Sequence, residues 1–297
     1  MKKLHIAVLF AWLILPAAFA QSLIIPETRE YKVLLDISKF SSAQKCCELF
    51  RDLFEKVADD HGFPTKRTDR LSPDREICFI DTPEFDLNKS GFLLRLRAEK
   101  INISKVEKLL QPTDDAELTL KFRAESIETA IIAPVESEER YGSKVSAETD
   151  VVVKSAAPIS IFSRSCGITD FGSTPASIEE LLKYYPRLAL AGLNGSHKLK
   201  VVNDIVIIEQ RLLQGSIEFG RKKSKSLFSI WYKKGESKPM LAEFSFKIKT
   251  KSYIAQNVEN SQNRVDNFFV DLISRSKPFT SQDQTKTGMV YQYQSED

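Results

Sequence analysis

The sequence predicts an α+β fold in which eight or more strands are covered by helices. Two observations lead to this prediction. Segments with alternating polar and apolar residues recur along most of the chain, and three other segments carry apolar residues at helical spacing. No linker rich in Pro, Gly or Ser is long enough to force a domain boundary, so residues 21–297 are expected to form a single domain with a C-terminal helix.

The length and charge of the chain narrow the classes of function. Its 297 residues and ordinary apolar content can bury a large core. The formal net charge is only +3, and no long Lys/Arg run is present. Nucleic acid is therefore not expected as the main partner, and any basic site must be local.

The first twenty residues have the pattern of a signal peptide. MKKLHIAVLFAWLILPAAFA combines a basic start, an apolar stretch and the small-residue ending Ala18-Phe19-Ala20. The apolar stretch is short for a bilayer span, which needs about 20 residues. We expect an exported protein, periplasmic or extracellular, with no membrane span after cleavage. One or two disulfides among Cys46, Cys47, Cys78 and Cys166 fit this compartment, and the sequence does not select a pairing.

The first half of the mature chain is predicted to contain one helix and a meander of strands. A strand covers 31–37, and a helix capped by Ser41 or Ser42 runs to about His61. Four further strands are predicted at 76–80, 91–99, 117–123 and 146–154.

The second half repeats this organisation after an irregular stretch predicted at 156–173. A helix begins near Ser177 and ends near Leu190. Strands are predicted at 198–213, 215–221, 226–233 and 240–249, with a hairpin turn at 234–236. The last helix covers 258–274, and 288–293 is read as a frayed final strand.

Six strand segments carry ionisable residues two or, in one case, four positions apart, which places each pair on one face of its strand. These pairs are Glu30/Lys32, Arg95/Arg97, Lys121/Arg123, Glu148/Asp150, Glu209/Arg211 and Glu243/Lys247, the last with Ser245 between its members. One explanation is a solvated sheet face. The other is a barrel whose outer face is covered by the helices, so that the charges point into a ligand-binding interior.

An inward-facing set of Arg95, Arg97, Lys121 and Arg123 would form an anion site, because guanidinium groups bind phosphate oxygens in a bidentate manner. Carboxylates in the same interior would repel that anion unless they hold a divalent cation. Cations for phosphate and carboxylates for a metal together indicate a polyanion such as a triphosphate.

The segment FIDTPEFDLNKSGFLLRLR, residues 79–97, resembles a signature of the CYTH superfamily, the triphosphate tunnel metalloenzymes. Asp81, Thr82, Pro83, Leu87, Gly91, Leu94, Arg95 and Arg97 match it in order. AELTLKFR is similar to the strand that follows it in the family, REYK resembles part of the E-x-E-x-K signature, and LAEFSFKIK resembles the late E-x-E strand.

This resemblance implies an eight-stranded antiparallel barrel, or tunnel, with flanking helices, and a lumen that binds triphosphate with Mg²⁺ or Mn²⁺. It implies catalytic roles for Glu30 and Lys32. The implied phosphate-binding residues are Lys32, Arg95, Arg97, Lys121, Arg123, Arg211 and Lys247. The implied metal ligands are Glu30, Glu148, Asp150 and Glu243.

Two departures from the family pattern affect the predicted chemistry. Thr28 and Ser245 stand where the family has glutamates. The absence of these two glutamates weakens the metal site more than the phosphate site. The sequence therefore leaves open a metal-dependent triphosphatase or polyphosphatase, a non-catalytic exported barrel that binds a phosphorylated ligand or a partner protein, and a structural barrel with internal salt bridges.

Overall fold

The computed structural model describes residues 26–99, 102–103, 110–111, 115–220, 222–250, 258–280 and 285–293. The predicted signal peptide lies outside these residues, as does the segment that joins the last two ranges. Within the described ranges, no helix has an apolar stretch of the length that a bilayer crossing requires.

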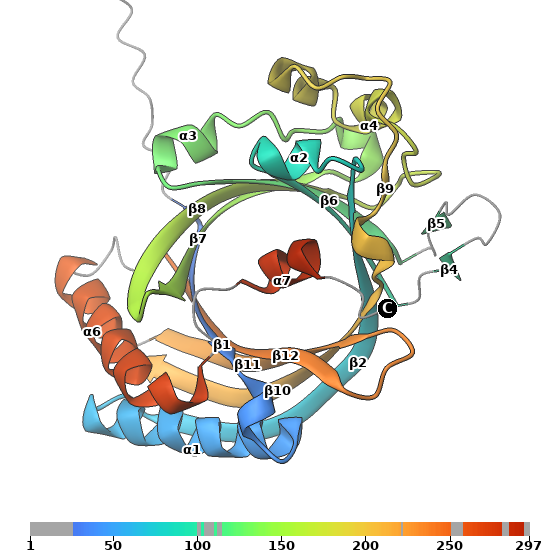
Figure 1. Ribbon diagram of the computed structural model, residues 1–297. Coiled ribbons are helices and arrows are strands. Elements are labelled where there is room, and N and C mark those ends of the chain that lie inside the picture. Colours follow the sequence, from blue (N-terminus) through green and yellow to red (C-terminus); the bar gives the residue numbers. More distant parts are fainter. Residues whose placement is uncertain are drawn as a thin grey trace, which may run out of the picture.

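The strands of the main sheet form a closed ring (Figure 1). The sheet has ten strands, of which the short β9 (Lys200–Val201) pairs only with β2. The pairing of β2 with β10 closes the other nine into the ring. In ring order these are β10 (Ile207–Phe219), β11 (Lys222–Lys233), β12 (Pro239–Lys249), β1 (Thr28–Leu35), β7 (Lys144–Lys154), β8 (Ala157–Ile168), β6 (Glu117–Ala124), β3 (Phe92–Ala98) and β2 (Thr65–Asp81).

The ring differs from the predicted sheet in strand number and direction. It has nine strands where the resemblance implied eight. β8 forms where an irregular segment was expected, and the segments predicted as separate strands at 198–213 and 215–221 contribute to one strand, β10. β8 pairs with β7 over nearly its whole length and with β6 over its second half, Phe162–Ile168. The prediction of a purely antiparallel sheet is also wrong, since β1 and β7 are parallel while the other neighbours in the ring are antiparallel. A two-stranded sheet of β4 (Asn102–Ile103) and β5 (Leu110–Gln111) stands apart.

The outer face of one half of the ring is covered by α1 (Ala43–Asp60) and α6 (Val258–Ser276), which lie side by side in Figure 1. Ser42 caps α1 by accepting a hydrogen bond from the backbone N–H of Lys45. The shared core is rich in aromatic rings. It includes Phe50 and Phe54 of α1, Phe268 and Phe269 of α6, and Tyr31, Phe228, Phe244 and Phe246 of the strands.

A second core lies outside the other half of the ring. Tyr185 is fully buried there, and its hydroxyl donates hydrogen bonds to the backbone oxygens of Leu118 and Cys166. The short helical segments on this side are α2 (Asp86–Lys89), α3 (Ile127–Ile131), α4 (Ile178–Tyr184) and the 3₁₀ segment Pro186–Ala191. Both halves of the ring thus have an apolar outer face under helices.

The last described element, α7 (Lys286–Gln292), is a helix and not the strand predicted at 288–293. It lies inside the ring (Figure 1). Its contacts place it at the end of the ring where β1 and β2 finish and β12 begins. Val290 packs in a third core with Leu34, Phe79 and Leu241 from the inner faces of three strands. These apolar contacts explain why a segment with little helical pattern of its own forms a helix there.

All four cysteines are buried and free. The disulfides considered from the sequence are therefore not formed.

Candidate functional site

The charged positions of the strands face the interior of the ring, because the apolar positions between them pack outside. On β1, Tyr31 belongs to the core beneath α1 and α6, so Glu30 and Lys32 point inward. On β6, Leu120 belongs to the second outer core, so its neighbour Lys121 points inward as well. The alternation seen in the sequence thus corresponds to an apolar outer face and a charged inner face.

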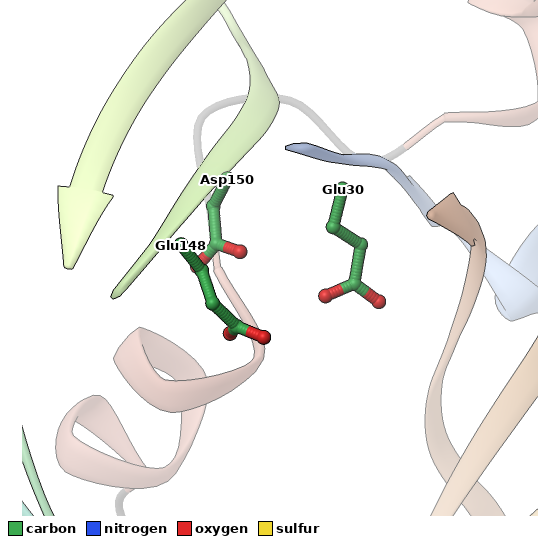
Figure 2. A group of neighbouring side chains, drawn as sticks. All are labelled: Glu30, Glu148 and Asp150. Carbon is green, nitrogen blue, oxygen red and sulfur yellow. The ribbon is translucent and has the colours of Figure 1, made fainter. Parts of the chain in front are cut away.

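Three carboxylates and three lysines from four strands form one cluster on the inner face, which we call the lysine–carboxylate network. Its members are Glu30 and Lys32 on β1, Glu148 and Asp150 on β7, Lys121 on β6 and Lys247 on β12. Figure 2 shows the three carboxylates, with Glu148 and Asp150 on β7 opposite Glu30 on β1. One ligand oxygen of each lies within 4.8 Å of the others.

Each lysine of the network contacts two of the carboxylates. Lys32 Nζ lies 2.8 Å from Asp150 Oδ1 and 3.1 Å from Glu30 Oε2. Lys247 Nζ lies 2.8 Å from Glu148 Oε1 and 3.6 Å from Glu30 Oε2. Lys121 Nζ makes longer contacts, 3.3 Å to Asp150 Oδ2 and 3.8 Å to Glu148 Oε2. The carboxylates are therefore neutralised within the protein.

The pKa shifts in the network follow from this pairing. Burial acts to raise the pKa of Asp150, but Lys121 and Lys32 together hold it well below its usual range. Burial acts to lower the pKa of Lys32, but Glu30 and Asp150 raise it above its usual range. The pKa of Lys121 is lowered, because burial and the nearby Arg123 outweigh Asp150. Lys121 is thus the least compensated lysine of the three.

Next to this network, Arg95, Arg97 and Arg123 form a second group on the inner face, which we call the arginine wall. Their contacts are few and long. An Nη of Arg95 donates to Thr119 Oγ1 at 3.5 Å, the nearest carboxylate oxygen of Glu117 is 4.0 Å from Arg97, and Arg123 donates to Thr287 Oγ1 of α7 at 3.4 Å. Within the part of the chain that the structure describes, the Nε atoms of all three arginines are buried without a hydrogen-bond partner.

The pKa values of the wall indicate crowded positive charge. Burial lowers the pKa of Arg95, and the nearby Arg75 and Arg123 lower it further against the opposing effect of Glu117. Burial, followed by Arg95 and Arg75, lowers the pKa of Arg97 to about 9. An anion bound beside these guanidinium groups would relieve both the burial cost and the mutual repulsion.

Two of the predicted site residues lie elsewhere on the inner face. Glu243 is not part of the three-carboxylate group, and its Oε1 lies 2.8 Å from Lys286 Nζ of α7. Arg211 donates to the backbone oxygen of Pro73 at 3.5 Å, and the charges that act on it belong to Arg75 and Glu209. The other nine predicted residues belong to the network or to the arginine wall.

A cluster around Glu209 was not predicted as part of the site. The carboxylate of Glu209 is 3% exposed and accepts hydrogen bonds from Ser229 Oγ at 2.6 Å and Trp231 Nε1 at 2.9 Å. It also contacts the guanidinium of Arg75, and Lys286 Nζ lies 3.9 Å away. In the sequence, the alternation of Glu209 with Arg211 indicates that Glu209 points inward. No sequence pattern indicates a role for Lys286.

The three carboxylates fit a divalent cation by their chemistry. Clustered carboxylate oxygens are the ligands that Mg²⁺ and Mn²⁺ prefer. Thr28 and Ser245, which stand where the resemblance expects carboxylates, also face inward, and the hydroxyl of Thr28 donates to Glu148 Oε1 at 3.3 Å. A cation at Glu30, Glu148 and Asp150 would take over charge that the lysines now neutralise, which would free the lysines for an anion.

Comparison with known proteins gives matches to solved structures only. No family model and no curated protein matches the chain. A Bacillus halodurans protein proposed to be an adenylate cyclase is 11% identical, with 90% of this chain and 100% of that chain covered and a TM-score of 0.35. A Hippeastrum protein proposed to be an adenylyl cyclase, with a dominant triphosphatase activity, is 12% identical. The match covers 88% of this chain and 93% of that chain, with a TM-score of 0.37.

A Vibrio parahaemolyticus protein proposed to be an adenylate cyclase is 11% identical over 80% of this chain and 87% of its own, with a TM-score of 0.26. At identities and TM-scores this low, no residue role is transferred from these proteins to this chain. The chain's own features carry the resemblance to the CYTH superfamily: the motif at 79–97, and a closed ring of strands with charged residues on its inner face.

Proposed function

We propose that the inner face of the ring binds a tri- or polyphosphate-type anion. The observation that carries this proposal is the arginine wall, in which three inward-facing guanidinium groups have buried, unpartnered Nε atoms. Structural salt bridges would leave few such donors, because an unpaired buried polar group is costly. A multiply charged phosphate offers several acceptor oxygens to the guanidinium groups, and Lys121 lies beside them on the same strand as Arg123.

Hydrolysis of the bound anion is a second candidate function, favoured by the three clustered carboxylates. Glu30, Glu148 and Asp150 would hold Mg²⁺ or Mn²⁺. When bound, the ion supplies charge neutralisation and Lewis acidity at phosphate oxygens. Lys32 would neutralise charge that develops on the phosphoryl group, and Glu30 would orient the attacking water. The departures at Thr28 and Ser245 make binding without turnover the alternative outcome.

Export belongs to the same proposal and is supported by the pattern of residues 1–20. In an exported protein, inorganic tri- or polyphosphate, or a scavenged organic phosphate, is a more suitable ligand than a nucleoside triphosphate. Mass spectrometry of the protein from its native host would test export, with a mature N-terminus at Gln21 as the expected result and an intact Met1 as the contradicting one.

Calorimetric titration of tripolyphosphate tests binding. The wild-type protein and an Arg67→Gln variant should bind alike, because Arg67 pairs with Glu55 and Asp52 of α1 on the outer face. The double variant Arg95→Gln/Arg97→Gln should bind about 100-fold more weakly, from the loss of two charge-assisted contacts. Equal affinity in all three proteins would overturn the proposal.

Phosphate release from tripolyphosphate, thiamine triphosphate and ATP, with and without Mg²⁺ or Mn²⁺, tests hydrolysis. Metal-dependent release that Glu30→Gln abolishes would support an enzyme. Tight binding with no release under any metal would leave the binding function and exclude turnover of these substrates.

A further inference from the structure

Four exposed cations extend the charged inner face toward the end of the ring that lies away from α7. They are Lys66 and Arg70 on β2, Lys225 on β11 and Lys249 on β12, and we call them the basic extension. Among the described residues, none of the four forms an ion pair with a carboxylate. Their positive charge is therefore uncompensated, unlike that of the lysine–carboxylate network.

Strand register places these side chains on the inner face, because directly opposed residues of paired strands share a face. Lys66 is opposite Ser216, which is opposite Lys225. The neighbours of Lys225 on β11, Ser224 and Ser226, are buried on the outer side of the sheet. Lys225 and Lys66 therefore point inward.

A second row of opposed residues joins Arg70 to the predicted catalytic residue Lys32. It runs from Arg70 through Leu213, Leu227 and Ser245 to Lys32. A register shift between Leu213 and Gly215 keeps both Leu213 and Ser216 on the inner face although they are three positions apart. Gly215 permits this bulge, since a Cβ there would lie 2.1 Å from the backbone oxygen of Lys66.

On β12, the basic extension is continuous with the lysine–carboxylate network. Lys249 lies two residues from Lys247, on the same face, and is opposite Thr28 in the way that Lys247 is opposite Glu30. A path of inward-facing positive charge therefore leads from the network toward the ends of β12, β11 and β2. A compact triphosphate held at the arginine wall would leave this path unused.

We propose that the ligand of the ring is a linear polyphosphate longer than tripolyphosphate, with one end at the arginine wall and the rest of the chain along the basic extension. This inference rests on the proposed function and names its substrate class. A nucleic acid fits the extension less well, because the inner-face residues between the cations are Leu213, Ser216, Leu227 and Ser245, which offer no aromatic ring for base stacking.

The test compares the affinities of the full mature chain for tripolyphosphate and for a long-chain polyphosphate, expressed per chain, with a single-stranded DNA oligonucleotide as the competing polyanion. The test variant is Lys66→Gln/Arg70→Gln/Lys225→Gln/Lys249→Gln. The control variant removes the same charge from exposed lysines on other elements, as Lys56→Gln/Lys89→Gln/Lys183→Gln/Lys198→Gln. Circular dichroism confirms that both variants are folded.

Wild type and control should prefer the long chain over tripolyphosphate, and the test variant should lose about 10- to 30-fold in affinity for the long chain alone, as expected for four exposed ion contacts. Equal affinity of the wild type for both phosphates, or an undiminished preference in the test variant, would overturn this inference while leaving the proposed function intact. Equal binding of the oligonucleotide would also overturn it. No binding of tripolyphosphate by the wild type would overturn the proposed function itself.

Discussion

The lysine–carboxylate network and the arginine wall adjoin each other on one inner face but differ in how their charge is balanced. Each lysine of the network contacts two carboxylates, and the shortest distances from Nζ to a carboxylate oxygen are 2.8 Å. In the arginine wall, the one ion pair among the described residues joins Arg97 to Glu117 at 4.0 Å, and no described residue is a hydrogen-bond partner of the Nε atoms. The network is thus satisfied by the protein alone, whereas the wall is not.

This difference separates residues that support the fold from residues that can bind a ligand. Removing one partner of a buried ion pair leaves the other charge uncompensated and is strongly destabilising. Removing a buried cation that has no partner relieves repulsion and costs the fold little. The two groups should therefore respond to substitution in opposite ways.

The largest effect is expected for Asp150→Asn. Asp150 is 2% exposed and pairs with both Lys32 and Lys121, so its loss leaves two cations beside each other. The free energy of unfolding, measured by urea titration, should fall by about 3 kcal/mol. Asp52→Asn removes an exposed partner of Arg67 and should change it by less than about 0.5 kcal/mol. Equal stability of the two variants would show that the network does not support the fold.

Arg95→Gln should show the opposite pattern. Tripolyphosphate affinity is expected to fall by about 10- to 100-fold, because a charge-assisted contact is lost. The free energy of unfolding without ligand should stay the same or rise, since an unpaired buried charge is removed. A loss of stability as large as that of Asp150→Asn would instead assign Arg95 a structural role.

The protein should lose stability as the pH falls, because two buried carboxylates have lowered pKa values in the folded state. Burial acts to raise the pKa of Glu209, but Lys286 and Arg75 lower it, and the pKa of Asp150 is lowered as well. In the unfolded chain these carboxylates titrate near pH 4. Their contribution is therefore complete above that pH and is lost as the pH falls below it toward the lower pKa values of the folded state.

Thermal denaturation between pH 6 and about pH 3 measures this loss. The melting temperature should decrease toward acid, and Glu209→Gln should flatten the decrease because one of the titrating groups is gone. A slope unchanged by the substitution would contradict the role given to Glu209.

The smallest effect is expected for a single one of the hydrogen bonds that α7 makes. Tyr291 Oη donates to Asp81 Oδ2 at 3.0 Å, and Asp81 is fully buried. Tyr291→Phe should lower the free energy of unfolding by about 1 kcal/mol. Tyr184→Phe, which removes an exposed bond to the backbone oxygen of Ser173, is the control and should have a smaller effect.

The sequence predicted the inner face better than the ring itself. Alternation and the motif at 79–97 identified the members of the network and the wall, because side-chain direction in a strand follows from position alone. The strand β8 was missed, since ISIFSRSCGI has Ser residues on the inner face and a Gly near its end, which weaken the alternation.

Features that depend on contacts between distant segments were not predictable. The parallel pairing of β1 with β7 and the closure of β2 on β10 carry no local signal. The same holds for α7, which is seven residues long and packs against Leu34, Phe79 and Leu241. As a result, the pairing of Lys286 with Glu243 was not predicted.

A crystal structure of the mature protein with bound tripolyphosphate tests the central claim most directly. We predict phosphate oxygens within hydrogen-bond distance of Arg95, Arg97 and Arg123, including the Nε atoms that now lack partners. Tripolyphosphate bound only on the outer surface, with the three guanidinium groups unchanged inside the ring, would contradict the claim.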